Sequence, residues 1–281
     1  MSWGKVPGGV EVEGEIEWKI EPIPPGKRLY KKNAVITGAS GGFGRAIAIE
    51  FAKEGANVIV HYNSNEENAK KVANEIKELG VEVGLYKADI TKWEEVKKMA
   101  EELWKSWQRI DILVNNAGTT APNQYSWREL SEEVIEETLN LDLKGTLYCA
   151  HEFGTRMLDL QRSGSIVNVA SNVITTGSPR SPIYAAAKYG IIGITKSYAL
   201  ALAPFVRVNA IAPGYMDTPA LRKRKDWTPE RRKWVIEHTP LRSLGKPENI
   251  ARVVVFLASQ DAIHITGETI FCDGGFTMAA I

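Results

Sequence analysis

The sequence has little of several features that would assign it to a special class of protein. Its 281 residues contain only two cysteines, Cys149 and Cys272, which excludes a disulfide-rich scaffold and favours a reducing compartment. No apolar run approaches the roughly 18 residues of a membrane-spanning helix, and the first residues are charged and proline-rich where a signal peptide is apolar. We therefore expect a cytoplasmic protein.

The charges are nearly balanced. Lys and Arg number 35 against 34 Asp and Glu, for a formal net charge of +1, so bulk charge predicts binding neither to nucleic acid nor to an anionic membrane. The four histidines form no zinc-binding pattern, and we expect no metal. What is present is ordinary globular composition, with 44% hydrophobic and 25% charged residues.

Residues 1–30 differ from the rest of the chain. They are rich in proline and glycine, and they carry a period-two pattern typical of a strand with one apolar and one charged face. The apolar positions of this pattern are Val10, Val12, Ile16, Trp18 and Ile20. We interpret residues 1–30 as an extended N-terminal arm that packs on the domain or on a neighbouring subunit, with a mobile tail as the alternative.

Residues 31–281 alternate between short β-rich runs and helical stretches. The strands are expected at residues 34–37, 57–61, 81–86, 112–114, 165–169, 206–211 and 269–271, and the helices at 44–53, 66–79, 93–107, 131–160, 184–203 and 247–258. Strict β–α alternation with apolar strands predicts a single α/β domain, a doubly wound parallel sheet of Rossmann-like type covered on both faces. Ligands bind to such a sheet at the carboxyl ends of its strands.

A glycine-rich turn follows the first strand, from Thr37 to Gly44, and leads directly into a helix. Such a turn lets the backbone approach a diphosphate, and the helix N-terminus supplies free N–H donors. The segment Gly38 to Gly42 also fits G-x-S-x-G, the nucleophile elbow of α/β-hydrolases, for which His238 or His264 could serve as the later histidine.

Motifs further along the chain decide between these two interpretations. Asn115-Asn116-Ala117-Gly118 follows one strand and Ser171 follows another, while Pro213-Gly214 ends a third. Tyr184 and Lys188 form Y-x-x-x-K inside a long helix. Together with a turn of the form T-G-x-x-x-G-x-G, this ordered set resembles the single-domain short-chain dehydrogenase/reductase family over about residues 33–275. The resemblance strongly favours a dinucleotide-binding oxidoreductase over a hydrolase.

The Y-x-x-x-K spacing has its own chemical meaning. Side chains four residues apart share one face of a helix, so the Lys188 ammonium is expected beside the Tyr184 phenol. A free phenol has a pKa of about 10, and a nearby positive charge stabilises its ionised form. A phenol tuned in this way can give a proton to a carbonyl oxygen as hydride reaches the carbon.

The resemblance implies a role for each matching residue. Ser171, thirteen residues before Tyr184, would hold the substrate oxygen beside the phenol, and Lys188 would also bind the nicotinamide ribose. The cofactor set implied in this way is Gly38, Ser40, Gly42, Phe43, Gly44, Tyr62, Asn63, Ser64, Asp89, Ile90, Asn116, Ala117, Gly118, Tyr184, Lys188, Pro213, Gly214, Met216 and Thr218.

One catalytic position departs from the common pattern of the family. Where the family usually has the asparagine of N-L-x-G, which extends a proton relay through water to the lysine, this chain has Asp142-Leu143-Lys144-Gly145. An aspartate can still hold a water, and its charge favours the lysine cation more strongly. A D-L-x-G segment, His61-Tyr62-Asn63-Ser64 and residues 203–215 resemble the branch of mannitol dehydrogenases, sorbose reductases and carbonyl reductases.

The end of the second strand bears on cofactor choice. NAD enzymes usually place a carboxylate there, about twenty residues after the turn. Here the position is Tyr62, followed by Asn63 and Ser64, which can donate hydrogen bonds to a 2′-phosphate. We expect a preference for NADP(H), with NAD(H) as the alternative.

Residues 215–242 are expected to form a substrate lid. Asn172, Tyr215 and Trp234 are the candidate substrate contacts. The run Arg222-Lys223-Arg224-Lys225 could indicate an anionic substrate, but a solvated helix face is the favoured interpretation of such a run. The long helices at 131–160 and 184–203 would build a homo-tetramer, as the resemblance implies.

The expected activity is NADP(H)-dependent interconversion of a secondary alcohol and a ketone, with a ketose or polyol as the substrate. The alternatives are a broad carbonyl reductase, a sugar 1-dehydrogenase and a 3-oxoacyl reductase. A nucleotide-binding regulatory protein is the alternative outside enzymes, and the intact set of Ser171, Tyr184 and Lys188 argues against it.

Overall fold

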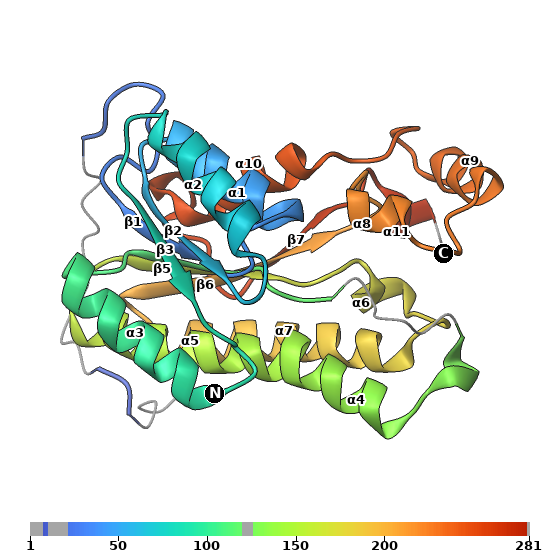
Figure 1. Cartoon of the computed structure of the whole chain (residues 1–281), viewed down its shortest axis with the longest axis horizontal. Coiled ribbons are helices and arrows are strands. Elements are labelled where there is room, and N and C mark those ends of the chain that lie inside the picture. Colours follow the sequence, from blue (N-terminus) through green and yellow to red (C-terminus); the bar gives the residue numbers. More distant parts are fainter. Residues whose placement is uncertain (1–7, 11–21, 120–125, 280–281) are drawn as a thin grey trace.

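A parallel sheet of seven strands forms the centre of the molecule (Figure 1), in a computed structural model that describes residues 8–10, 22–119 and 126–279. The strands run in the order β3-β2-β1-β4-β5-β6-β7. They are β1 (Asn33–Ile36), β2 (Asn57–Tyr62), β3 (Val83–Lys87), β4 (Ile112–Asn115), β5 (Gly164–Val169), β6 (Val206–Pro213) and β7 (Thr269–Cys272). The order turns between β1 and β4, so the ligand-binding edge is expected there. The predicted doubly wound α/β fold is confirmed.

Helices cover both faces of this sheet. Figure 1 shows α1, α2 and α10 on one side and α3, α5 and α7 on the other, with α8, α9 and α11 beyond the carboxyl ends of the strands. The α-helices are α1 (Gly42–Lys53), α2 (Glu66–Lys77), α3 (Trp93–Trp107), α4 (Glu132–Thr138), α5 (Gly145–Asp159), α6 (Val173–Thr176), α7 (Pro182–Ala201), α8 (Pro219–Arg222), α9 (Pro229–His238), α10 (Pro247–Ala258) and α11 (Phe276–Ala279). Single-turn helices lie at η1 (Trp127–Glu129) and η3 (Gln260–Ala262).

Two hydrophobic cores result from the alternation of side chains along each strand. Ala34 and Ile36 of β1 face the core beneath α1, α2 and α10, whereas Val35 faces the core beneath α3 and α5. All three side chains are fully buried. Successive residues of a strand point to opposite faces, so an apolar strand without alternation is the pattern that a sheet covered on both sides requires.

The stretch predicted as one helix over 131–160 is interrupted. It consists of α4, a π-helical segment η2 (Leu139–Lys144) and α5. In a π-helix each backbone N–H donates to the carbonyl oxygen five residues earlier, which makes the turn wider than in an α-helix. Such segments are frequent at functional sites. Asp142 lies in this wide turn and is completely buried.

The segment that precedes the sheet is fastened to the domain. Leu29 is 1% exposed, and Arg28 forms an ion pair with Glu54 at the end of α1. Val10 packs against the core beneath α3 and α5, and the other apolar positions of the predicted arm lie outside the described residues.

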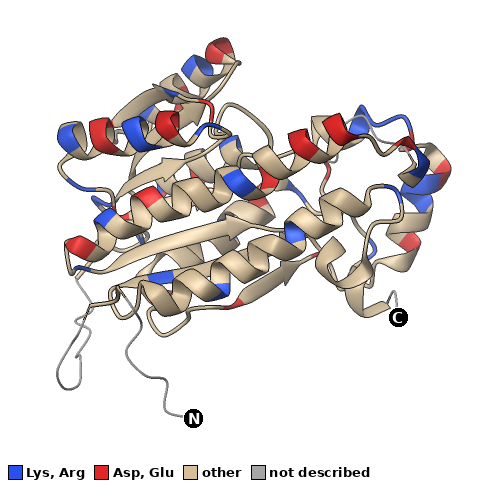
Figure 2. Ribbon diagram, turned by 90° about the horizontal axis from the view of Figure 1, so that it is seen from below, with Lys and Arg blue, Asp and Glu red and all other residues tan. Residues whose placement is uncertain are grey.

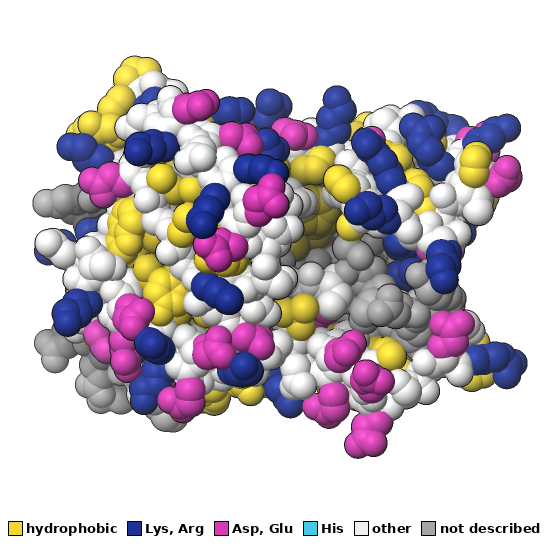
Figure 3. All heavy atoms as spheres, viewed as in Figure 1, with side chains coloured by type: hydrophobic (Ala, Val, Ile, Leu, Met, Phe, Trp, Pro, Cys, Tyr) yellow, Lys and Arg dark blue, Asp and Glu magenta, His cyan; other side chains and the backbone are white. Residues whose placement is uncertain are grey.

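The helices carry charged side chains of both signs. Lys, Arg, Asp and Glu are interspersed along the helices in Figure 2, in agreement with the small net charge. Among the helices of the described part, none is long and apolar enough to cross a membrane. Figure 3 shows a hollow on one face, between α1 and the segment that carries α8 and α9.

Candidate active site

The glycine-rich turn between β1 and α1 is held by the loop after β4. Gly38 has a φ of +64°, and a Cβ on it would stand 2.9 Å from the Cα of Ala117. The hydroxyl of Thr37 accepts from the backbone N–H groups of Asn116 at 2.9 Å and Ala117 at 3.0 Å. Both the conformation and the close approach therefore demand glycine at position 38.

The N-terminus of α1 has the properties of a diphosphate site. Its cap residue, Gly41, supplies no side-chain hydrogen bond, and the first turn contains no acidic residue. A Cβ on Gly41 or Gly42 would meet nothing within 4 Å, so open space lies in front of the turn. Free N–H donors and the positive end of the helix dipole face that space, and the residues present therefore fit the pyrophosphate of a dinucleotide.

His61 connects this turn to the neighbouring strands. The N–H of Gly38 donates to Nδ1 of His61 at 3.1 Å, and Nε2 lies 3.1 Å from the carbonyl oxygen of Ala88. Nδ1 thus accepts, so the ring carries its proton on Nε2 and donates it to Ala88. Burial lowers the pKa of His61 to about 4, which keeps the imidazole neutral. The sequence motifs gave no indication of this contact.

Ser171, Tyr184 and Lys188 meet where β5 and α7 approach each other. Ser171 lies two residues after the end of β5, while Tyr184 and Lys188 lie in the first two turns of α7. The Lys188 ammonium donates to the carbonyl oxygen of Val169 at 3.2 Å and lies 5.6 Å from the centre of the Tyr184 ring. Ser171 and Tyr184 line one cavity of about 250 Å³.

Asp142 is the partner of the lysine. Its Oδ1 lies 3.0 Å from Nζ of Lys188, and its carboxylate accepts from the N–H and the hydroxyl of Thr119 at 3.1 and 2.7 Å. Burial opposes the Lys188 charge, but Asp142 and Tyr184 outweigh it and raise the pKa of Lys188. A Cβ on Gly118 would stand 2.5 Å from Oδ1 of Asp142, which explains the glycine at this position.

The predicted cofactor residues after β2 differ in exposure. Tyr62 is 8% exposed and packs in the core beneath α1 and α2. Asn63 and Ser64 are exposed at the carboxyl end of β2.

Three other predicted cofactor residues use their side chains within the protein. Asp89 accepts from the N–H and the hydroxyl of Thr91 at 3.0 and 2.7 Å. Ile90 is 3% exposed and packs over Gly145. The amide of Asn116 donates to the carbonyl oxygen of Thr37 at 2.9 Å. Asn116 thus holds the glycine-rich turn, and the contacts of Asp89 and Ile90 are with the protein itself.

The segment after β6 closes the cavity. Among the predicted residues, Phe43, Asn172, Pro213, Gly214, Tyr215, Met216 and Thr218 line it. Trp234 is not among the described residues that line it, in contrast to the prediction; its ring stacks on His238 and contacts Phe276 edge-on. Sequence reasoning missed Val173, Thr176, Pro179, Arg180, Arg231 and Phe276, which also line it. Arg224 lines it too, and it belongs to the basic run for which a solvated face was the favoured interpretation.

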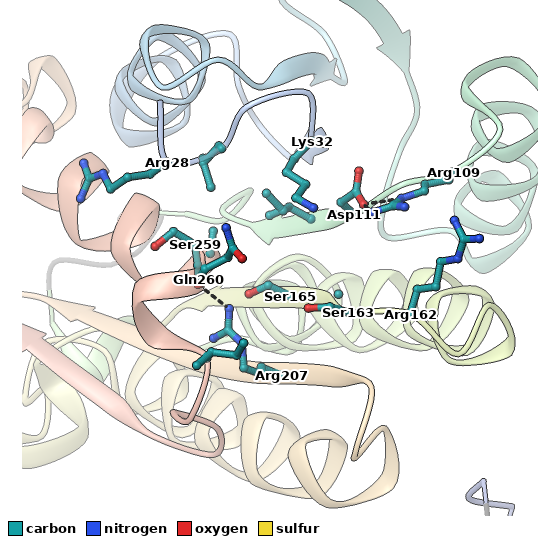
Figure 4. A pocket seen from close by; sticks show the side chains of 15 residues that line it. Arg28, Lys32, Arg109, Asp111, Arg162, Ser163, Ser165, Arg207, Ser259 and Gln260 are labelled. Atoms are coloured by element: carbon teal, nitrogen blue, oxygen red, sulfur yellow. Dashed lines mark hydrogen bonds and ion pairs between the residues drawn. The ribbon is translucent and has the colours of Figure 1, made fainter. Parts of the chain in front are cut away.

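A second cavity, of about 330 Å³, lies at the opposite edge of the sheet, at the amino ends of β1, β4, β5 and β6. Figure 4 shows that basic side chains surround it. Arg28 pairs with Glu54 and Arg109 with Asp111, while Arg207 donates to the carbonyl oxygens of Leu257 and Ser259 at the end of α10. These three arginines therefore bind groups of the protein itself. Ser171, Tyr184 and Lys188 lie at the other end of the sheet, near the carboxyl ends of the strands.

Comparison with known proteins agrees with this geometry. Residues 38–277 match a family model described as enoyl-(acyl carrier protein) reductase. The chain is 39% identical over 248 residues to a 3-oxoacyl-[acyl-carrier-protein] reductase of Staphylococcus epidermidis, covering 88% of this chain and 99% of that protein. A protein of the same name from Thermotoga maritima is 39% identical over 253 residues, covering 89% of this chain and 100% of the relative.

The protein is a member of the short-chain dehydrogenase/reductase family. It is thus an oxidoreductase. A solved structure described as a short-chain alcohol dehydrogenase from Sinorhizobium meliloti superposes with a TM-score of 0.84 at 33% identity, covering 92% of this chain and all of that chain. One described as a gluconate dehydrogenase from Agrobacterium tumefaciens gives 0.84 at 28% identity, covering 90% and 98%.

This short-chain dehydrogenase contains no described cluster of three or more His, Cys, Asp or Glu side chains that could hold a metal ion. The thiol of Cys149 is buried in the core, and burial raises its pKa. The chemically active groups that line the cavity include the Ser171 hydroxyl, the Tyr184 phenol, three arginine guanidinium groups and the Asp226 carboxylate.

Proposed function

We propose that the protein interconverts a ketone and a secondary alcohol by NADP(H)-dependent hydride transfer, with a small polar ketone of the ketose class as substrate. The observation that carries this proposal is the convergence of Ser171 and Tyr184 on one cavity, with Lys188 buried behind the phenol. The open space in front of the N-terminus of α1 supports the proposal that the protein binds a dinucleotide.

Each residue of this set has a distinct task in the reduction. The bound dinucleotide supplies the hydride. The Ser171 hydroxyl donates a hydrogen bond to the substrate carbonyl oxygen, and the Tyr184 phenol gives that oxygen a proton as the carbon is reduced. The Lys188 ammonium stabilises the resulting phenolate, and Asp142, 3.0 Å from it, holds the ammonium in place.

The preference for NADP(H) rests on the turn after β2. Asn63 and Ser64 are exposed there and can donate hydrogen bonds to a 2′-phosphate, and no carboxylate stands at those two positions to repel it. NAD(H) is the alternative, and it would need the ribose hydroxyls to be bound by the same two polar side chains.

Reduction of a 3-oxoacyl thioester is a second candidate. The relatives at 39% identity that carry this name cover almost their full length, and this observation favours it. Oxidation of a sugar acid is a further candidate, which the structural relative described as a gluconate dehydrogenase supports. A broad carbonyl reductase uses the same three side chains.

We also propose a homo-tetramer assembled through α5 and α7. Large apolar side chains are exposed on these two helices, namely Leu147 at 37%, Tyr189 at 51% and Leu200 at 55%. Such residues on adjacent long helices are suited to a subunit interface. Light scattering of the purified protein tests this: a monomer mass would contradict it.

The test of the activity is a set of initial rates with NADPH and NADH in parallel. The substrates are sorbose, fructose, an aryl ketone, a 3-oxoacyl thioester and an enoyl thioester, and Ser171→Ala is the control. Turnover of the ketoses with NADPH that is lost in the variant supports the proposal. Turnover confined to the 3-oxoacyl thioester would replace the ketose by the second candidate, and turnover confined to the enoyl thioester would overturn carbonyl reduction.

A further inference from the structure

Three arginines converge on the cavity that holds Ser171 and Tyr184. Arg180 lies in the loop between α6 and α7, Arg224 follows α8, and Arg231 belongs to α9. They thus come from two segments about forty residues apart, which the fold brings to the same wall. None of the three was singled out by a family motif.

Negative charge at this wall is scarce. Asp226 is the only carboxylate among the described residues that line the cavity, so three guanidinium groups face one carboxylate. Its oxygens accept from Nε of Arg224 at 2.9 Å and lie 3.6 Å from Nη1 of Arg180. One acid is therefore shared between two arginines, and the wall keeps an excess of two positive charges, three minus one.

Two of these arginines are held away from bulk solvent. The side chain of Arg180 is 16% exposed and that of Arg224 is 22% exposed. Burial lowers the pKa of Arg180, and the like charge of Arg224 lowers it further, although Asp226 opposes both effects. Burial of a positive charge costs free energy because the charge loses its contact with water. An anion that enters the cavity offsets this cost by pairing with the charge.

The third arginine is fixed by aromatic rings. Arg231 donates to the hydroxyl of Tyr215 at 3.3 Å, and its guanidinium lies 4.7 Å from the centre of the Trp234 ring. Tyr215 in turn stacks on Trp227 and meets Phe276 edge-on. A planar guanidinium held in this way is suited to carboxylate or phosphate oxygens, which it can bind through two parallel hydrogen bonds.

We propose that the carbonyl substrate is anionic, and that its carboxylate or phosphate group is bound by Arg180, Arg224 and Arg231 while its ketone lies at Ser171 and Tyr184. This deepens the proposed function and rests on it. The substrate class is then an oxidised sugar acid or a sugar phosphate, rather than a neutral ketose or an apolar ketone.

The basic run at 222–225 contains the matched control. Arg222 is 63% exposed and pairs with Asp217 at 2.7 Å, and it does not line the cavity. Arg224, two residues later, faces the cavity. The sequence interpretation of this run as a solvated face therefore fits Arg222, whereas Arg224 belongs to the proposed anion site.

The experiment compares matched substrates with and without an anionic group. The pairs are sorbose with 5-ketogluconate, which carries a carboxylate in place of a terminal hydroxymethyl group, and fructose with fructose 6-phosphate. We expect kcat/KM of the wild type to be at least about tenfold higher for one of the anionic partners, a difference of about 1.4 kcal/mol. The two pairs distinguish a carboxylate from a phosphate.

The same ratio of anionic to neutral kcat/KM is then measured in variants. Arg180→Gln and Arg231→Gln should each lower the ratio about tenfold, Arg231→Lys should restore part of it, and Arg222→Gln should leave it at the wild-type value. A ratio near one in the wild type, or an unchanged ratio in both glutamine variants, would overturn the inference while the proposed function stands.

A binding measurement separates the two proposals if no ketone is turned over. Calorimetry of the enzyme saturated with NADPH compares gluconate with sorbitol, which differ by one carboxylate. Binding of gluconate that weakens in Arg180→Gln supports the anion site even though the proposed reaction fails. Equal or absent binding of the two compounds contradicts it.

Discussion

Acidification should destabilise the protein through His61, whose imidazole is neutral in the folded state. Its pKa in the fold is about 4, against 6.5 for the free side chain, because the ring is buried. The unfolded chain therefore binds a proton first as the pH falls. The free energy of unfolding is unaffected by His61 above about pH 6.5 and decreases between that pH and about pH 4.

The size of the effect follows from the shift in pKa. A difference of about 2.5 pKa units, at about 1.4 kcal/mol per unit, corresponds to a full loss of between about 3 and 4 kcal/mol, of which about 3 kcal/mol is lost by pH 4. The geometry points the same way, because Nδ1 accepts from the N–H of Gly38 and cannot do so once protonated. Acid should therefore loosen the glycine-rich turn as well as the fold.

The assay is urea denaturation at intervals from pH 7 to pH 4, on wild type, His61→Gln and His264→Gln. A glutamine amide has one acceptor and one donor for Gly38 and Ala88 and does not titrate in this range. The difference between wild type and His61→Gln should therefore change by about 3 kcal/mol over the interval. His264 is exposed, and its variant should follow the wild type. Parallel curves for wild type and His61→Gln would refute the reasoning.

Three further predictions concern the site. Asp142→Asn removes the charge that raises the pKa of Lys188, so the loss of kcat/KM at high pH should begin at lower pH than in the wild type; an unmoved profile would contradict the ion pair's role. Gly38→Ala should weaken NADPH binding at least about tenfold in fluorescence titration, because its Cβ would stand 2.9 Å from Ala117 at a φ of +64°; wild-type affinity would contradict the cradle. Asn63→Asp should lower the NADPH-to-NADH ratio of kcat/KM about tenfold through repulsion of the 2′-phosphate, and an unchanged ratio would place that phosphate elsewhere.

The parts of the site that could be predicted are those set by local spacing or by strand ends. Tyr184 and Lys188, four residues apart, share a face of any helix that contains them, and Ser171 lies two residues after a buried strand. Parallel strands bring their carboxyl ends to one edge of the sheet, which places Ser171 and Gly214 on the same side of the molecule. Both line the same cavity.

The parts that could not be predicted depend on contacts between distant segments. Arg180 and Phe276 are almost a hundred residues apart, and neither lies in a periodic pattern, yet they share a wall of the cavity. The π-helical turn around Asp142 replaces a helix that the pattern showed as continuous. Tyr62 matched a cofactor position by sequence, but the packing beneath α1 and α2 takes its ring into the core.

The central claim is that the Tyr184 phenol transfers the proton in a hydride-transfer reaction. The most direct measurement is kcat/KM of Tyr184→Phe with the best carbonyl substrate, together with NADPH affinity of the same variant. We expect a loss of about three orders of magnitude in kcat/KM, with NADPH affinity changed by no more than about threefold. Turnover by Tyr184→Phe close to that of the wild type would contradict it.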